Sequence, residues 1–147
     1  MGTQSAEDSG DEMISNVVVE SVMDLIDSLS LFPAIKRGAL GTEAGITCEV
    51  ATSSVESVFL DKNSYILVDL TFNAKGADLE TLTSNLDTVV DTLTRKTSYP
   101  SGDGWKIVDI THGTPPIPTI IGRSEENLWI VACAVVVKFY RKDEETT

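Results

Sequence analysis

The sequence predicts a single α+β domain, and three observations carry this prediction. Residues 128–141, LWIVACAVVVKFYR, form a long apolar run rich in β-branched and aromatic residues, which favour an extended strand over a helix. Residues 14–29 and 79–93 repeat apolar side chains every three or four positions, as amphipathic helices do. Residues 65–72 alternate between apolar and polar side chains, as a half-buried strand does.

The 147 residues are about the right number for one domain, and no linker or internal repeat divides them. We expect a disordered acidic tail over residues 1–12, one folded domain over 13–142 and a frayed tail over 143–147. Residues 1–12 have neither a basic region nor a hydrophobic stretch, so we expect no signal peptide. No apolar run reaches about 18 residues, so we expect no membrane-spanning helix.

The first half of the chain is expected to begin with a helix over residues 14–29 and to continue into a β-hairpin. Pro33 and three following glycines predict that a loop separates these two elements. Residues 46–51 and 55–60 read as short strands separated by a turn at 52–54, and a polar link at 61–63 leads into the strand at 65–72.

The second half is expected to hold a helix and three strands. Asp78 is placed to cap the helix that begins at residue 79. Residues 105–111 read as a strand, residues 112–118 as a proline-pinned bend, and residues 117–122 as a short strand in which Pro118 donates no ladder hydrogen bond. The strand at 128–141 is apolar on both faces, so we expect it at the centre of a sheet that is covered on both sides.

The net charge and the two cysteines argue against a nucleic-acid partner and against a metal site. The formal net charge of −12, with 11 scattered Lys and Arg residues, argues against nucleic acid as the main partner, because phosphate binding needs a concentrated basic surface. Cys48 and Cys133 fall within strand patterns and match no metal-ligand spacing, so we expect two buried free thiols and no metal site. A reducing compartment fits this usage.

The sequence does not favour a catalytic site. His112 is the only histidine, and Asp109 lies near it in sequence, but no nucleophile with its own orienting partner accompanies them. Cys48 has no identifiable base. No glycine-rich phosphate loop is present in the sequence. We therefore expect no enzymatic activity and no cofactor.

Several sequence segments of the chain resemble those of a family of small structural proteins of long-tailed bacteriophages, the minor capsid or tail-terminator proteins. The resemblance covers residues 13–142 and is strongest in the closing phrase PTIIGRSEENLWIVACAVVVKFYRK. Other phrases that carry it are ITCEVATSSVES, VFLDKNSYILVDLTFNAKG, LETLTSNLDTVVDTL and WKIVDITHGTPP. The resemblance implies a mixed, mainly antiparallel sheet with two helices packed mostly on one face.

The same resemblance implies a structural, non-catalytic role in the virion. Such a protein forms a homo-oligomeric ring, usually hexameric, that caps the tail tube and joins it to the connector of the head. Its partners would be the tail tube protein, the head–tail connector protein and DNA that passes through the lumen without specific binding. It would be assembled in the host cytoplasm and would not contact a membrane. The acidic surplus could line that lumen.

Candidate subunit contacts lie in the loop at 38–45, in the preceding basic pair and in the proline-bearing segment. Prolines reduce the entropy lost when a loop docks, although both loops could also merely connect elements. The candidate residues are Lys36, Arg37, Thr114, Pro115, Pro116, Ile117, Pro118, Arg123 and Trp129. Two alternatives stay open: a non-viral module that binds a protein or a small ligand, with a pocket lined by the second face of the last strand, and a small enzyme with His112 in a cleft.

Overall fold

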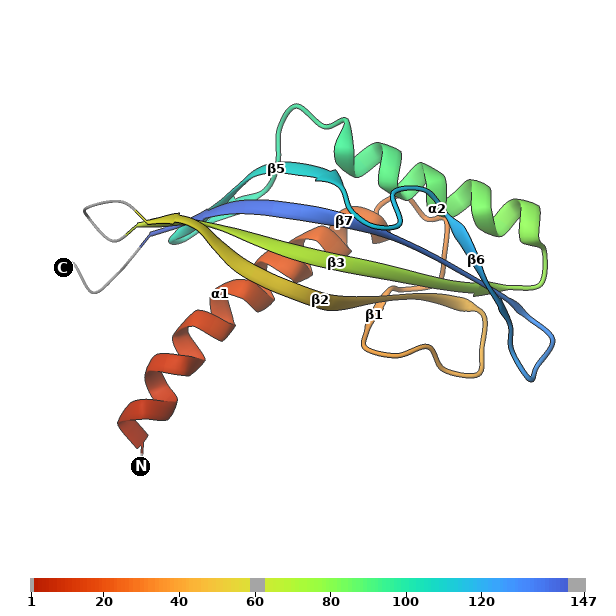
Figure 1. The fold of residues 1–147 in the computed structure, drawn as a ribbon, viewed down its shortest axis with the longest axis horizontal. Coiled ribbons are helices and arrows are strands. Elements are labelled where there is room, and N and C mark those ends of the chain that lie inside the picture. Colours follow the sequence, from red (N-terminus) through yellow and green to blue (C-terminus); the bar gives the residue numbers. More distant parts are fainter. Residues whose placement is uncertain (1, 59–62, 143–147) are drawn as a thin grey trace.

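A computed structural model describes residues 2–58 and 63–142 and has an α+β fold with two helices and a seven-stranded sheet, as expected (Figure 1). Its elements in chain order are α1 (Gly2–Asp27), β1 (Lys36–Arg37), β2 (Gly45–Val58), β3 (Ser64–Gly76), α2 (Leu79–Thr94), β4 (Ser101–Gly102), β5 (Trp105–His112), β6 (Thr119–Arg123) and β7 (Trp129–Arg141).

The strand order β1-β2-β3-β7-β5-β4 places β7 inside the sheet, which confirms the central position predicted for it. Along its whole length β7 pairs antiparallel with β3. On its other side β7 pairs with two strands in succession: β6 lies along residues 129–132 and β5 along residues 135–141. Among the described strands, only β1 runs parallel to its neighbour, so the sheet is mixed and mainly antiparallel.

The core lies between one face of the sheet and both helices. Alternate residues of β3 and β7 point into it, and those on β7 from Val131 to Phe139 are completely buried. Helix α1 contributes Val18, Val22 and Ile26 to the same cluster. Helix α2 contributes a second apolar stripe: Leu82, Leu86, Val89, Val90 and Leu93. Because all of these side chains belong to one cluster, the two helices cover the same face.

Helix α2 begins where the sequence predicted. The Asp78 carboxylate accepts a hydrogen bond from the Glu80 backbone N–H at 3.2 Å and another from the Thr81 hydroxyl at 2.7 Å. These hydrogen bonds lower the pKa of Asp78, the Thr81 hydroxyl contributing most. An N-cap of this kind satisfies a helix N–H that has no partner within the helix.

Two elements differ from the sequence-based expectation. Helix α1 begins at Gly2, so residues that were expected to be a disordered tail are helical, and Figure 1 shows this end of α1 projecting away from the sheet. Strand β2 is continuous over 14 residues instead of turning at 52–54. Its register against β3 shifts between Val50 and Thr52 and again between Val55 and Ser57. Each shift marks a β-bulge, where β2 has one residue more than β3. Residues 61–62 of the expected polar link lie outside the described residues.

Candidate subunit interface

The proline-bearing segment after β5 is held against β7 by its own backbone. The Gly113 N–H donates to the Ala134 carbonyl at 2.8 Å, and the Ala134 N–H donates to the Pro115 carbonyl at 2.8 Å. A Cβ atom at Gly113 would lie 2.9 Å from the backbone carbon of Ala134, which explains why glycine is required there. The segment therefore continues the hydrogen bonding of β7 between β5 and β6.

The side chains of this segment divide into anchored and outward-facing groups. The peptide bond between Thr114 and Pro115 is cis, and Pro115 and Pro118 are half-buried. Thr114, Pro116 and Ile117 are exposed, Ile117 to 62%. The segment thus presents a fixed backbone with one large apolar side chain toward the surroundings, which suits a docking surface.

Arg123 and Trp129, two further candidates, contact each other. The Arg123 guanidinium lies 4.5 Å from the centre of the Trp129 ring, a cation–π contact across the paired ends of β6 and β7. A guanidinium nitrogen of Arg123 also donates to the Asn127 carbonyl at 3.4 Å. Arg123 is therefore held in place while its outer surface stays exposed.

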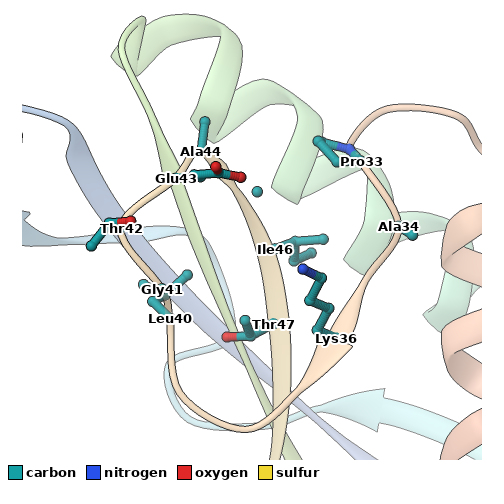
Figure 2. A pocket seen from close by; sticks show the side chains of 11 residues that line it. Pro33, Ala34, Lys36, Leu40, Gly41, Thr42, Glu43, Ala44, Ile46 and Thr47 are labelled. Atoms are coloured by element: carbon teal, nitrogen blue, oxygen red, sulfur yellow. The ribbon is translucent and has the colours of Figure 1, made fainter.

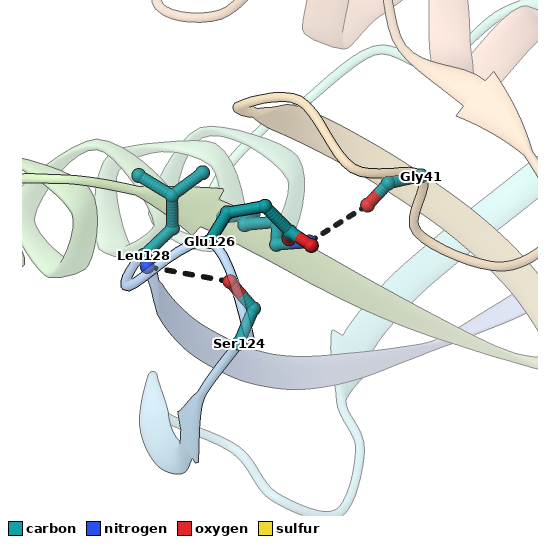
Figure 3. Close-up of polar contacts among 5 residues, drawn as sticks. Gly41, Ser124, Glu126 and Leu128 are labelled. Carbon is teal, nitrogen blue, oxygen red and sulfur yellow. Dashed lines mark hydrogen bonds and ion pairs between the residues drawn. The ribbon is translucent and has the colours of Figure 1, made fainter.

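The turn between β6 and β7 is built on Ser124. Its N–H donates to the Leu128 carbonyl at 2.8 Å, and its hydroxyl accepts from the Leu128 N–H at 3.3 Å (Figure 3). Asn127 adopts a positive φ of 65°, which asparagine tolerates better than most residues. The turn presents Glu126 toward the open face of β3.

Lys75 joins this turn to the loop at residues 38–45, a link that the sequence did not reveal. Its ammonium group, only 6% exposed, lies 2.6 Å from a Glu126 carboxylate oxygen and donates to the Gly41 carbonyl at 2.8 Å (Figure 3). The hydrogen bond from Lys75 is the main cause that lowers the pKa of Glu126, followed by one from Ser124. The structure therefore joins the candidate loop at 38–45 to the turn that follows β6, on the face opposite the helices.

Lys36 and Arg37 form β1, and both are exposed. They pair in parallel with Thr47 and Cys48 of β2. A guanidinium nitrogen of Arg37 donates to the Asn16 side chain of α1 at 3.4 Å. The basic pair thus ties the loop to the sheet and to α1, and the Lys36 ammonium remains at the surface.

A cavity of about 330 Å³ lies beside this loop (Figure 2). Its wall includes Lys36, Glu43 and Ile46, together with Thr47, whose hydroxyl is buried and has no hydrogen-bond partner among the described residues. The cavity is lined by residues 33–47, on the β1 side of the sheet.

Among the residues whose side chains are described, the large apolar ones that remain exposed lie on two sides of β7. On the β2 side they belong to α1 and β2: Val17, Val50 and Val55. On the other side of β7 they belong to β5, β6 and the segment before β6: Val108, Ile117, Ile120 and Ile121. Several exposed apolar side chains on one side of a protein can mark an interaction surface.

The candidate catalytic residues His112 and Asp109 both lie on β5 and are exposed, whereas Cys48 is buried on β2. The His112 ring contacts the Pro116 carbonyl at 3.2 Å and is exposed. Cys48 and Cys133 are free and fully buried on the helix-covered face, and burial raises the pKa of each thiol to about 12. Among residues 2–58 and 63–142, no cluster of histidine, cysteine and carboxylate side chains could hold a metal ion. In the same part of the chain, no helix is both long and apolar enough to cross a bilayer.

The fold and these surfaces define a small α+β protein with one helix-covered sheet and two open sheet edges. No protein-family model matches the chain, and no curated protein sequence does. Among solved structures, the chain is similar to one in a structure described as the virion of a native gene transfer agent particle. The two share 12% identity with a TM-score of 0.51 over 73% of this chain and 78% of the other, and a likeness at this identity shows a shared fold.

Proposed function

We propose that this protein is a structural, non-catalytic component of a phage-like virion. The observation that carries the proposal is the fold it shares with a chain of a gene transfer agent virion over about three quarters of its length. The resemblance of its closing strand and proline-bearing segment to tail-terminator proteins points to the same kind of particle. Fold alone does not fix function, so the surfaces of this chain supply the second part of the argument.

Within the virion, we propose the role of tail terminator: a ring, usually of six copies, that stops growth of the tail tube and joins it to the head connector. A ring needs two different surfaces on each subunit, because a cyclic contact is heterologous. The two sets of exposed apolar residues lie on opposite sides of β7 and differ in sequence, as such a contact requires. The tube and connector proteins would then dock on the two rims of the ring.

The negative charge suits a particle through which DNA passes. Both helices expose carboxylates, including Glu20 and Asp24 on α1 and Asp87 and Asp91 on α2. A lumen lined by such groups would repel phosphates and let DNA slide without binding. Neutralising these carboxylates should slow ejection of DNA, and unchanged ejection kinetics would contradict this part of the proposal.

Particle morphology tests the role. The gene would be deleted from the genome that encodes it, and the particles would be viewed by negative-stain electron microscopy. A terminator predicts tail tubes of uncontrolled length that lack heads, and these defects should disappear when the protein is supplied in trans. Particles with normal tails of normal length would exclude the terminator role.

A further inference from the structure

Two segments that are distant in the sequence meet over the side chain of Lys75. This residue lies near the end of β3, with β2 on one side and β7 on the other. The loop at residues 38–45 leads into β2, and the turn between β6 and β7 leads into β7. Gly41 of the loop and Glu126 of the turn supply acceptors for the Lys75 ammonium, which is only 6% exposed (Figure 3).

The loop has few other attachments. Its first residue, Gly38, donates its N–H to a carbonyl of β2 at 3.0 Å, and its last, Gly45, belongs to β2. Among the described residues, the bond from Lys75 to Gly41 is the one hydrogen bond made to residues 39–44. Gly38 and Gly45 have φ angles of 101° and 157°, which glycine adopts readily and other residues rarely. The loop is thus fastened at its middle by one contact and has a glycine at each end.

The space beside the loop is not filled. The cavity of about 330 Å³ has Leu40, Gly41 and Thr47 in its wall (Figure 2). Thr47 is only 6% exposed, yet its hydroxyl has no hydrogen-bond partner among the described residues. A buried, unpaired hydroxyl costs free energy that is recovered when the group reaches water. The closed position of the loop therefore relies on its contact with Lys75.

We infer that Lys75 and Glu126 form a latch that keeps the loop at 38–45 closed, so that a change at the turn between β6 and β7 opens the loop. A buried ammonium is stable only while acceptors, above all a carboxylate, pair with it. When Glu126 is removed or pairs with another cation, the Lys75 side chain turns toward water and gives up the Gly41 carbonyl. The Glu126 side chain is 37% exposed, so a basic side chain of a docking partner can reach it.

The latch couples two surfaces that were identified as candidate contacts. The turn follows Arg123, and the loop follows the basic pair at Lys36 and Arg37. A partner that binds at the turn would therefore change the surface that the protein presents on the β1 side of the sheet. The inference concerns contacts within one chain, so it goes beyond the tail-terminator role and does not depend on it.

A cysteine beside the loop reports its opening. Thr47→Cys places a thiol of similar size at the buried site, and a maleimide reagent should modify it only when the loop opens. Modification should be slow in this variant and roughly tenfold or more faster once Glu126→Gln is added, because the buried ammonium then lacks its carboxylate. Protein without the new cysteine measures the background, which the buried Cys48 and Cys133 should keep low.

The matched control is Glu125→Gln, since Glu125 is an exposed carboxylate of the same turn whereas Lys75 pairs with Glu126. In the Thr47→Cys background this control should leave the rate unchanged. Lys75→Met should raise the rate as Glu126→Gln does, and the two together should raise it no further, because both break the same latch. Additive effects would show two independent contacts and would overturn the coupling.

Proteolysis gives a second measurement in protein that keeps Thr47. Glu43 is exposed in the loop, and a protease specific for glutamate should cleave after it when the loop opens. Cleavage there should be faster in Glu126→Gln than in wild type or Glu125→Gln, with circular dichroism spectra that stay the same. Equal rates with and without Glu126 in either assay would overturn the inference, whereas the virion role is decided separately by the morphology of the deletion particles.

Discussion

The two faces of β7 differ in what covers them, although the sequence makes both apolar. On the face toward the helices, side chains from Val131 to Phe139 are fully buried. On the other face Ala132 and Ala134 are buried, whereas Ile130 and Val136 are only half-buried. No described helix covers this second face, since both helices belong to the cluster on the first.

The difference teaches that apolar side chains on both faces of a strand predict its central place in the sheet and not two covering layers. On the open face, short alanines are shielded by neighbouring strands and by the segment at Gly113, whose backbone lies against Ala134. Lysine and tyrosine then follow at Lys138 and Tyr140. Double coverage was expected, and within the described residues the protein itself supplies only one layer.

The largest expected loss of stability comes from truncating a valine on the helix-covered face of β7, compared with a valine on its open face. Val137→Ala removes two methyl groups from a fully buried site and should lower the free energy of unfolding by about 2 kcal/mol. Val136→Ala, one residue away on the half-buried face, should cost less than half as much. Urea unfolding followed by circular dichroism measures both, and equal losses would contradict the difference between the faces.

Lys75→Met should have a smaller effect, and the effect should depend on pH. Lys75 stabilises the ionised Glu126, whose pKa is lowered by this contact. A carboxylate with a lowered pKa in the folded state contributes stability above its ordinary pKa, and loses it as pH falls through the folded value. The difference in stability between wild type and variant should therefore be constant near neutrality and shrink below roughly pH 4. A difference that grows on acidification would contradict the contact.

The smallest expected effect on stability comes from placing a cysteine on the open face of β7, and it is read out as thiol reactivity. Cys48 and Cys133 lie on the helix-covered face with pKa values raised to about 12, so about one thiol in ten thousand is ionised at pH 8. Ellman's reagent should modify them only after unfolding. A cysteine placed on the open face by Val136→Cys should react in the folded protein, and a reaction as slow as that of the native thiols would show that the face is covered.

The sequence predicts most of the fold because burial of one side of a helix or strand produces a periodic pattern of apolar residues. The stripe of α2, its cap at Asp78 and the central position of β7 are confirmed, since each is encoded by neighbouring residues. The expected turn at residues 52–54 is wrong for the opposite reason. Thr52, Ser53 and Ser54 are exposed, so β2 shows no alternation there, and only its pairing with β3 makes it a strand.

The candidate interface was only partly predictable. The proline-bearing segment and the basic pair at Lys36 and Arg37 can be recognised as candidate contacts from their residue types alone. Lys75 does not, because a lysine near the end of a strand ordinarily points to water. Its partners, Gly41 and Glu126, lie 34 and 51 residues away in the chain. Such a contact depends on tertiary structure, which no local pattern records.

The double attachment of Ala134 has a consequence for how this half of the protein tolerates change. Because Gly113 and Pro115 both bond to that one residue, β5 and β6 are fastened to a common reference point on β7. Loss or gain of a residue between Gly113 and Pro115 would therefore break at least one of these two hydrogen bonds. Keeping both would shift β5 or β6 by one residue against β7 and exchange its inward side chains for its outward ones.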